Sequence, residues 1–257
     1  MHGLIGDSQE VLEDNMRGRI LFLLGISTLA TGCFATRLTQ TAEPVGEGLS
    51  ELSLSMNSTQ ITSFAGEDVG GFWPNLIPNV HYALGISDTM DFFGNVSGAS
   101  WYGELGIKLA LVQSESGTFS VAPSVGLSPL GPLASTRTAL PLLYTHRVSD
   151  KVALTAMGEV TYRHRGDVSA TESGGEIAGT FQGNTLGIGG GLGVEVRNRN
   201  FYVRPALTYT HYNASFAGAE DEQEIGLAQV AFTFGRIGGK TGAQLDRIEQ
   251  KLDAMNE

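Results

Sequence analysis

The stretch "GELGIKLALV" (residues 103–112) alternates apolar side chains with small or charged ones, one residue at a time. Leu105, Ile107 and Leu109 have one parity, whereas Glu104 and Lys108 have the other. Successive side chains of a β-strand point to opposite faces, so the pattern predicts a strand with one apolar and one polar face. With nine similar stretches it predicts strands at residues 48–57, 78–87, 90–97, 101–113, 118–128, 137–148, 151–163, 184–197, 201–212 and 223–235.

Two architectures are compatible with alternating strands: a soluble β-sandwich with its apolar faces inward, and a membrane barrel with its apolar face toward lipid. The runs last about ten residues, which suits a tilted membrane strand better than a soluble one. Long connections such as 58–77 and 164–184 alternate with tight ones such as 149–150. The sequence therefore predicts an all-β, antiparallel up-and-down transmembrane β-barrel over residues 48–235. Because the third strand is irregular, eight strands remain an alternative to ten.

Two sets of residues follow from the barrel topology. One comprises aromatic side chains that the topology places near strand ends on the lipid-facing register, where an interfacial girdle is expected: Phe119, Tyr162, Phe201, Tyr209 and Phe234. The other comprises charged side chains on the opposite face, which are expected to line the lumen: Glu51, Glu104, Lys108, Arg147, Glu159, Arg163, Glu195 and Arg204. Since both signs are interspersed, the lumenal set favours a structural plug over an ion-selective path.

The N-terminal region has the layout of a secretory signal. Basic "MRGR" precedes the apolar run "ILFLLGISTLATG", which is too short to span a bilayer as a helix. Residues 1–15 carry acidic groups and no Lys or Arg, so Met16 is the expected translation start. We expect a signal helix within residues 1–32 and a linker over 33–47, anchored through the chain's single cysteine, Cys33.

The segment "LATGC" (residues 29–33) resembles the lipobox of bacterial lipoproteins, although Ala30 stands where that box usually has leucine. This resemblance implies a thioether-linked diacylglycerol on Cys33, and Phe34 rather than aspartate after it implies sorting to the outer membrane. The strand pattern resembles small bacterial outer-membrane β-barrel proteins. Both resemblances imply outer-membrane lipids, the barrel assembly machinery and the lipoprotein sorting machinery as partners.

The tail, residues 236–257, is expected on the periplasmic side. Its apolar residues recur at helical spacing and predict a short amphipathic helix: Leu245, Ile248, Leu252 and Met255. Such a helix could cap the barrel mouth, pair with a copy of itself or rest on the membrane.

Several function classes are disfavoured. The net charge of −11 argues against nucleic-acid binding. "RIGGKTG" (236–242) resembles a nucleotide-binding loop, but Phe234 occupies the position of its first glycine. The glycine-rich stretch at 186–196 contains no dinucleotide fingerprint. Its lumenal glycines are expected to form a groove filled by Tyr202 and Arg204.

The four histidines beyond the signal, His81, His146, His164 and His211, lack ligand spacing, so no metal site is expected. "THYNAS" (210–215) loosely resembles the active segment of outer-membrane lipid A deacylases, which raises an acyl-ester hydrolase using His211 as an alternative. The leading interpretation is a non-enzymatic outer-membrane barrel lipoprotein with a structural, surface-contact or narrow-channel role. It needs no cofactor beyond the lipid. A soluble periplasmic β-sandwich lipoprotein is the third interpretation.

Overall fold

The computed structural model describes residues 38–64, 67–73, 78–97, 102–128, 135–165, 169–170, 179–180, 183–216 and 223–238. The predicted signal helix, Cys33 and the predicted helix of the tail lie outside these ranges. Within them, no helix is long and apolar enough to cross a membrane.

The described residues form fourteen strands. They are β1 (Ser50–Phe64), β2 (Glu67–Trp73), β3 (Pro78–Ser87), β4 (Met90–Ser97), β5 (Tyr102–Gln113), β6 (Gly117–Val121), β7 (Ser124–Ser128), β8 (Ser135–Ser149), β9 (Val152–Arg165), β10 (Ser169–Ala170), β11 (Gly179–Thr180), β12 (Gly183–Asn198), β13 (Phe201–Phe216) and β14 (Gln223–Gly238).

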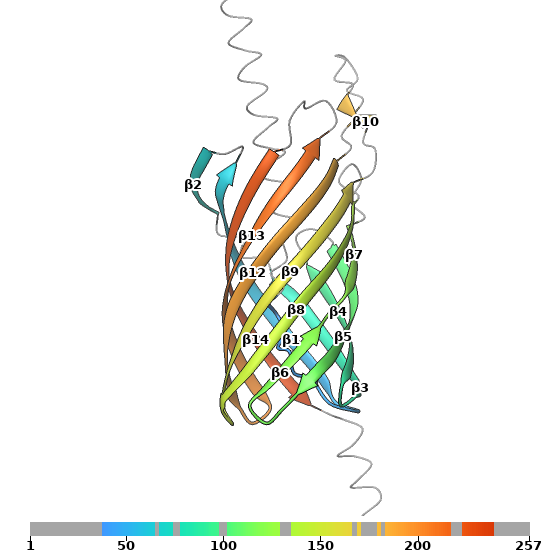
Figure 1. Ribbon diagram of the computed structural model, residues 1–257, viewed down its shortest axis with the longest axis vertical. Helices are drawn as coiled ribbons and strands as arrows, with labels where there is room; N and C mark the ends of the chain where they lie inside the picture. Colours follow the sequence, from blue (N-terminus) through green and yellow to red (C-terminus); the bar gives the residue numbers. More distant parts are fainter. Residues whose placement is uncertain are drawn as a thin grey trace, which may run out of the picture.

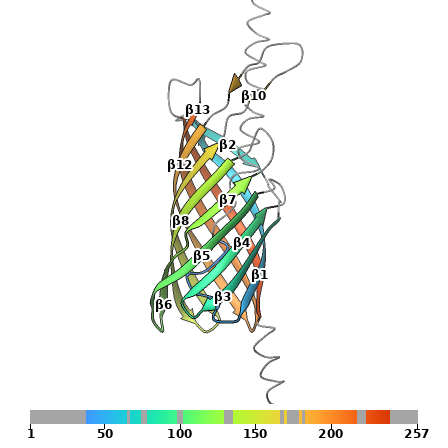
Figure 2. The ribbon, with the colours of Figure 1, turned by 90° about the vertical axis from the view of Figure 1, so that its right-hand side faces the viewer.

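All of these strands except β10 and β11, which pair with each other in a separate sheet, belong to one antiparallel sheet. It closes into a barrel with ten positions around its wall (Figures 1 and 2). Along the chain each wall strand pairs with the next, and β6 and β7 together fill one position. The last strand then pairs with the first, from Ser50↔Gly238 to Phe64↔Ile225. The predicted up-and-down barrel of ten strands is therefore confirmed, and the eight-strand alternative is not needed.

The strand predicted at 118–128 is divided by Ala122 and Pro123 into β6 and β7. Both halves keep one register against β8, from Val121↔Leu142 to Ser124↔Ala139. The division arises because proline has no N–H to donate to the ladder. Its carbonyl still accepts a bond of 3.1 Å from the Ile107 N–H, so the wall stays continuous.

Strand pairing extends further than apolar alternation does. β1 continues to Phe64 because its polar upper half still pairs with β14. β3 pairs with the first part of β1, up to the pair Met56↔Pro78. β2, which lies within the predicted connection 58–77, pairs with the later part of β1, from Thr59 to Phe64. β2 and β10 both lie at the long-loop end of the barrel (Figure 1).

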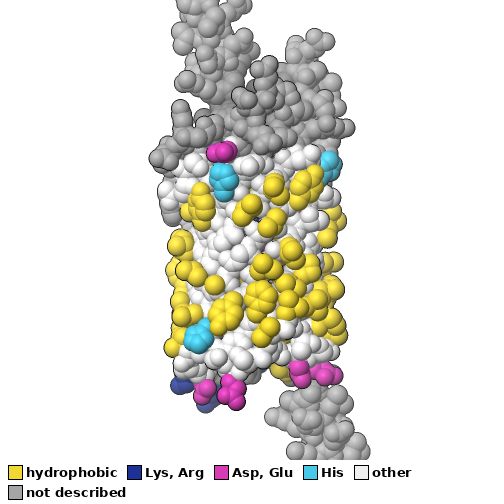
Figure 3. Space-filling model, in the orientation of Figure 1, with side chains coloured by type: hydrophobic (Ala, Val, Ile, Leu, Met, Phe, Trp, Pro, Cys, Tyr) yellow, Lys and Arg dark blue, Asp and Glu magenta, His cyan; other side chains and the backbone are white. Residues whose placement is uncertain are grey.

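The outer wall is apolar and the interior is polar. In β5, Leu105 and Ile107 are 59% and 42% exposed, whereas Lys108 is fully buried. Hydrophobic side chains cover the wall in Figure 3, and most of the charged side chains visible there lie at its lower, short-turn end. This arrangement is favourable when hydrocarbon surrounds the barrel. The soluble β-sandwich is therefore wrong, because its apolar faces would have to meet each other inside.

The prediction of a linker at 33–47 is wrong for residues 38–45. Residues 38–45, called the lumenal segment below, lie inside the barrel, with Leu38 and Ala42 fully buried. This stretch mixes four polar residues with four apolar ones (Leu38, Ala42, Pro44 and Val45), a composition that does not exclude a solvated linker. It also suits the interior of this barrel, because the surrounding wall is polar.

Candidate functional site in the barrel lumen

The lumenal segment fills the short-turn half of the barrel. Besides Leu38 and Ala42, the side chains of Thr39, Gln40 and Thr41 are each 4% exposed. The chain passes from this buried stretch to Gly48, whose N–H donates to the Gly85 carbonyl at 3.2 Å, and then into β1. The segment therefore lies across the lumen just before the barrel wall begins.

One side of the segment is held by an ion pair on the wall. Lys108 of β5 and Asp91 of β4 are both fully buried and lie 2.9 Å apart. The Lys108 ammonium also donates to the carbonyls of Thr41, at 3.4 Å, and Glu43, at 2.7 Å. Both carboxylate oxygens of Asp91 accept from the Val45 N–H at 3.0 Å. The pair thus satisfies three polar groups of the segment's main chain.

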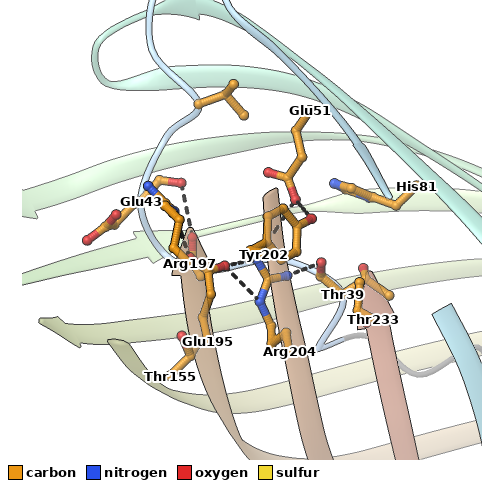
Figure 4. A network of polar contacts seen from close by, with 12 residues as sticks. Thr39, Glu43, Glu51, His81, Thr155, Glu195, Arg197, Tyr202, Arg204 and Thr233 are labelled. Carbon is orange, nitrogen blue, oxygen red and sulfur yellow. Dashed lines mark hydrogen bonds and ion pairs between the residues drawn. The ribbon is translucent and has the colours of Figure 1, made fainter. Parts of the chain in front are cut away.

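A second cluster of polar side chains comes from β1, β12 and β13 and lies around Arg204 (Figure 4). Arg204 of β13 donates to the Thr39 carbonyl and pairs with Glu195 of β12. Glu51 of β1 lies 3.8 Å from the Arg204 guanidinium and accepts a hydrogen bond from the Tyr202 hydroxyl. This cluster joins three wall strands to the lumenal segment.

Ala42 is bound from both sides by hydroxyl groups. Its N–H donates to the Thr145 hydroxyl at 2.8 Å, and its carbonyl accepts from Ser120. Thr145 is in turn hydrogen-bonded to Thr155 at 2.9 Å. At the mouth, Glu43 accepts from Arg147.

The glycine groove of β12 is filled differently from the prediction. Gly187 faces Tyr212, and Gly191 faces Thr208, each close enough that an added Cβ would lie 2.5 Å from the neighbouring side chain. At Gly193 the neighbour is Leu38, whose methyl group would lie 2.9 Å from such a Cβ. Tyr202 and Arg204 instead enter the cluster around Glu51, because their polar groups find charged partners there.

A further set of polar contacts involves predicted lumenal residues on other wall strands. Arg137 of β8 pairs with Glu159 of β9 at 2.8 Å. Asn95 of β4 donates to Glu104 at 3.3 Å, and its carbonyl oxygen lies 2.6 Å from His81 Nδ1.

The structure buries seven of the eight charged residues predicted for the lumen, Arg163 included, at 8% exposure or less. Arg147 is 54% exposed and lies at the mouth rather than inside. Glu51, Glu195 and Arg204 come together, while Lys108 belongs to the other cluster.

Sequence reasoning missed Asp91, Arg137 and the lumenal segment. Arg137 has the same parity as Arg147, so alternation alone could have found it. Asp91 lies in the strand with the weakest pattern.

A small polar cavity of about 200 Å³ opens at the short-turn mouth. Charged side chains of both signs line it: Glu43, Arg147, Asp150, Lys151, Glu195 and Arg197. Of these, Arg197 bonds Glu195 at 2.6 Å.

The predicted girdle residues lie on the outer face of the wall. Phe201 and Phe234, near the short-turn end, are 62% and 50% exposed, and Phe119 is half-buried. Tyr162 and Tyr209 are 46% and 47% exposed. Among the described side chains, four more aromatic residues point outward, with the same parity as the other exposed residues of their strands, but were not predicted as girdle residues: Tyr82, Phe92, Tyr144 and Phe232.

The histidines do not form a common site. Within the described ranges, no group of three His, Cys, Asp or Glu side chains could hold a metal ion. His81 is buried inside, whereas His211 is half-buried on the outer register between Tyr209 and Asn213. The side chain of Ser215, the hydroxyl nearest in sequence, lies outside the described residues.

No protein-family model matches this chain, and no curated protein matches its sequence. Among solved structures it is similar to Ail, the attachment invasion locus protein of Yersinia pestis, at 12% identity and a TM-score of 0.32, over 74% of this chain and 99% of that one. It is also similar to the outer membrane protein OprG from Pseudomonas aeruginosa, at 10% identity and a TM-score of 0.37, over 77% and 99%.

A third similar structure is the COG4313 outer membrane channel from Pseudomonas putida F1, at 10% identity and a TM-score of 0.44, over 77% and 98%. At these identities the likeness concerns the fold alone. The closed wall, its outward apolar band and its polar interior are those of a barrel in a bacterial outer membrane.

Proposed function

We propose that this chain is a non-enzymatic outer-membrane β-barrel lipoprotein that acts in envelope structure or surface contact. The observation that carries the proposal is the lumenal segment, which packs across the short-turn half of the barrel. Leu38 and Ala42 there are fully buried. A barrel closed by its own chain serves as a rigid membrane body rather than as a steadily open pore.

The bonding of the lumenal charges supports a structural role. Lys108 pairs with Asp91 and Arg204 pairs with Glu195, each across two wall strands. Lys108, Asp91 and Arg204 also bond main-chain atoms of the segment. Charged groups bound in this way stabilise one arrangement of the interior. Surface contact is supported by β2, which extends the wall at the long-loop end, the side that outer-membrane barrels turn outward.

Conductance of the full chain in planar lipid bilayers tests the closed lumen. We expect insertion of the folded barrel without steady ionic current, because the segment and the paired charges occupy the short-turn half. A large current that stays open in every insertion would contradict the proposal. The control is the same preparation unfolded by boiling, which reports any current caused by detergent or aggregates.

The lipoprotein part of the proposal rests on the lipobox-like segment before Cys33. Lipid attachment there would bring the sorting machinery and outer-membrane phospholipids into contact with the chain, and the barrel assembly machinery would insert it. The amphipathic pattern of the tail supports self-association there as part of the same proposal.

Replacing Cys33 by serine tests the anchor. We expect Cys33→Ser to abolish incorporation of radiolabelled fatty acid and to leave an unprocessed precursor, since the thioether needs the thiol. Thr36→Ser, three residues later, is the matched control and should be labelled and processed normally. Normal processing of Cys33→Ser would show that this segment is not a lipobox.

A further inference from the structure

The lumenal segment is held mainly by polar contacts. Its bonds to the wall run through main-chain groups of Thr39, Thr41, Ala42, Glu43 and Val45. Apolar packing is limited to the side chains of Leu38, Ala42 and Val45. Water can replace hydrogen bonds of this kind at modest net cost, whereas it cannot replace a large apolar contact.

The buried charges of the wall that bond the segment keep wall partners without it, whereas Arg147, which pairs with Glu43 of the segment, is already 54% exposed at the mouth. Lys108 pairs with Asp91 at 2.9 Å, and Arg204 pairs with Glu195, so both pairs join one wall strand to another. Withdrawal of the segment would therefore leave neither of these buried pairs broken, and an unpaired charge buried inside a barrel is the costly outcome. Two arrangements of the segment can thus be close in free energy, as a two-state element requires.

The wall beside the segment also suits water. Buried polar atoms on β1 and β3 have no hydrogen-bond partner among the described residues: Asn57 Oδ1, Asn79 Oδ1 and His81 Nε2. The amide oxygen of Gln40, in the segment itself, is in the same situation. Buried polar groups of this kind normally bond to water. We therefore expect water to enter this side of the lumen.

We infer that the lumenal segment is a displaceable gate, and that its withdrawal opens the barrel to small hydrated ions. This inference rests on the proposed function, in which the segment closes the lumen. The exposed wall would carry Glu51, Asp91 and Glu195 together with Lys108 and Arg204. Because both signs line the path, it would pass small cations and small anions with little preference between them.

The contact between Leu38 and Gly193 allows a wall substitution that destabilises the closed position of the segment. A Cβ at Gly193 would lie 2.9 Å from the Leu38 methyl group and 3.5 Å from Ala206 Cβ. Gly193→Val therefore presses on the segment and disfavours the closed state. Gly158→Val is the matched control, because a Cβ at Gly158 meets nothing within 4 Å and points to the outer face.

Single-channel recording in planar bilayers tests the gate with potassium chloride alone as the probe. We expect rare brief openings of the unmodified chain, an open fraction at least about tenfold higher in Gly193→Val, and no change in Gly158→Val. Adding Leu38→Ala to Gly193→Val should return the open fraction toward that of the unmodified chain, because the clash is removed. If Gly193→Val gives no channel openings although it still migrates as a folded barrel on unheated gels, the proposal that the segment is a gate is wrong.

A disulfide lock separates this inference from the proposed function. The Ala42 N–H lies 2.8 Å from the Thr145 hydroxyl, so cysteines at these two positions should bridge the segment to the wall. In a Gly193→Val chain with Cys33→Ser, oxidation of that pair should stop the current and reduction should restore it. Current through the oxidised form would show that ions do not pass the segment. Steady current through the unmodified chain would contradict the proposed function instead.

Discussion

At the scale of single residues, the barrel reverses the usual arrangement of a water-soluble protein. Lys108 and Arg204 have 0% and 1% of their side-chain surface exposed, while Leu192 on the outer wall is 69% exposed. Buried charges of this kind persist only when they are paired and hydrogen-bonded. The lumenal segment supplies part of that bonding through its main-chain carbonyls.

Replacing Lys108 by glutamine leaves Asp91 buried without its cation. We expect Lys108→Gln to lower the free energy of unfolding by about 3 kcal/mol, the range found for one-sided loss of a buried ion pair. The double variant Lys108→Met with Asp91→Asn should lose less, because no charge remains unpaired. Urea unfolding in detergent micelles, followed by tryptophan fluorescence, measures both.

The exposed Lys151 at the mouth provides the control for that measurement. Lys151→Gln should change the stability little, since exposed lysines contribute little. A loss in Lys108→Gln no larger than that in Lys151→Gln would show that the lumenal pair does not stabilise the barrel.

At the scale of elements, alternation of apolar and polar residues was sufficient to predict the ten wall positions. It could not predict β2, because the polar upper half of β1 pairs there through its backbone, which leaves no apolar signal. It also placed β6 and β7 in one strand, since Pro123 keeps the alternation while removing an N–H.

Pro123 leaves one ladder position half satisfied. The Ile107 N–H donates to the Pro123 carbonyl, but proline cannot donate back to the Ile107 carbonyl. We expect Pro123→Ala to add that hydrogen bond and to raise the free energy of unfolding by about 1 kcal/mol. Hydrogen exchange should then show a protected amide at position 123.

Pro141 on β8 is in the same situation as Pro123, because its carbonyl accepts a ladder bond from the Ala122 N–H. Destabilisation by Pro123→Ala would mean that the break between β6 and β7 is required by the wall. An unprotected amide at 123 would mean that the Ile107 carbonyl is already satisfied.

At the scale of the whole molecule, the sequence predicted the wall but not its contents. The charged set followed from parity, and seven of its eight members lie buried. Residues 38–45 could not be placed, because four polar and four apolar residues in so short a segment do not distinguish a buried position from a linker in water. Their position depends on hydrogen bonds to residues of five wall strands, β4, β5, β6, β8 and β13. These partners, such as Asp91 and Thr145, lie 46 or more residues away in the chain.

Two neighbouring positions on β8 distinguish a lumenal segment inside the barrel from one outside it. Thr145 is buried on the lumenal face, whereas Tyr144, one residue earlier, is 47% exposed on the outer face. The measurement is disulfide formation in isolated outer membranes. Two Cys33→Ser chains are compared: one carries Ala42→Cys with Thr145→Cys, and the other carries Ala42→Cys with Tyr144→Cys. We expect rapid cross-linking with position 145 and none with position 144, because only position 145 faces the lumen. Equal cross-linking at both positions, or none at 145 in a folded barrel, would contradict a position of the segment inside the barrel.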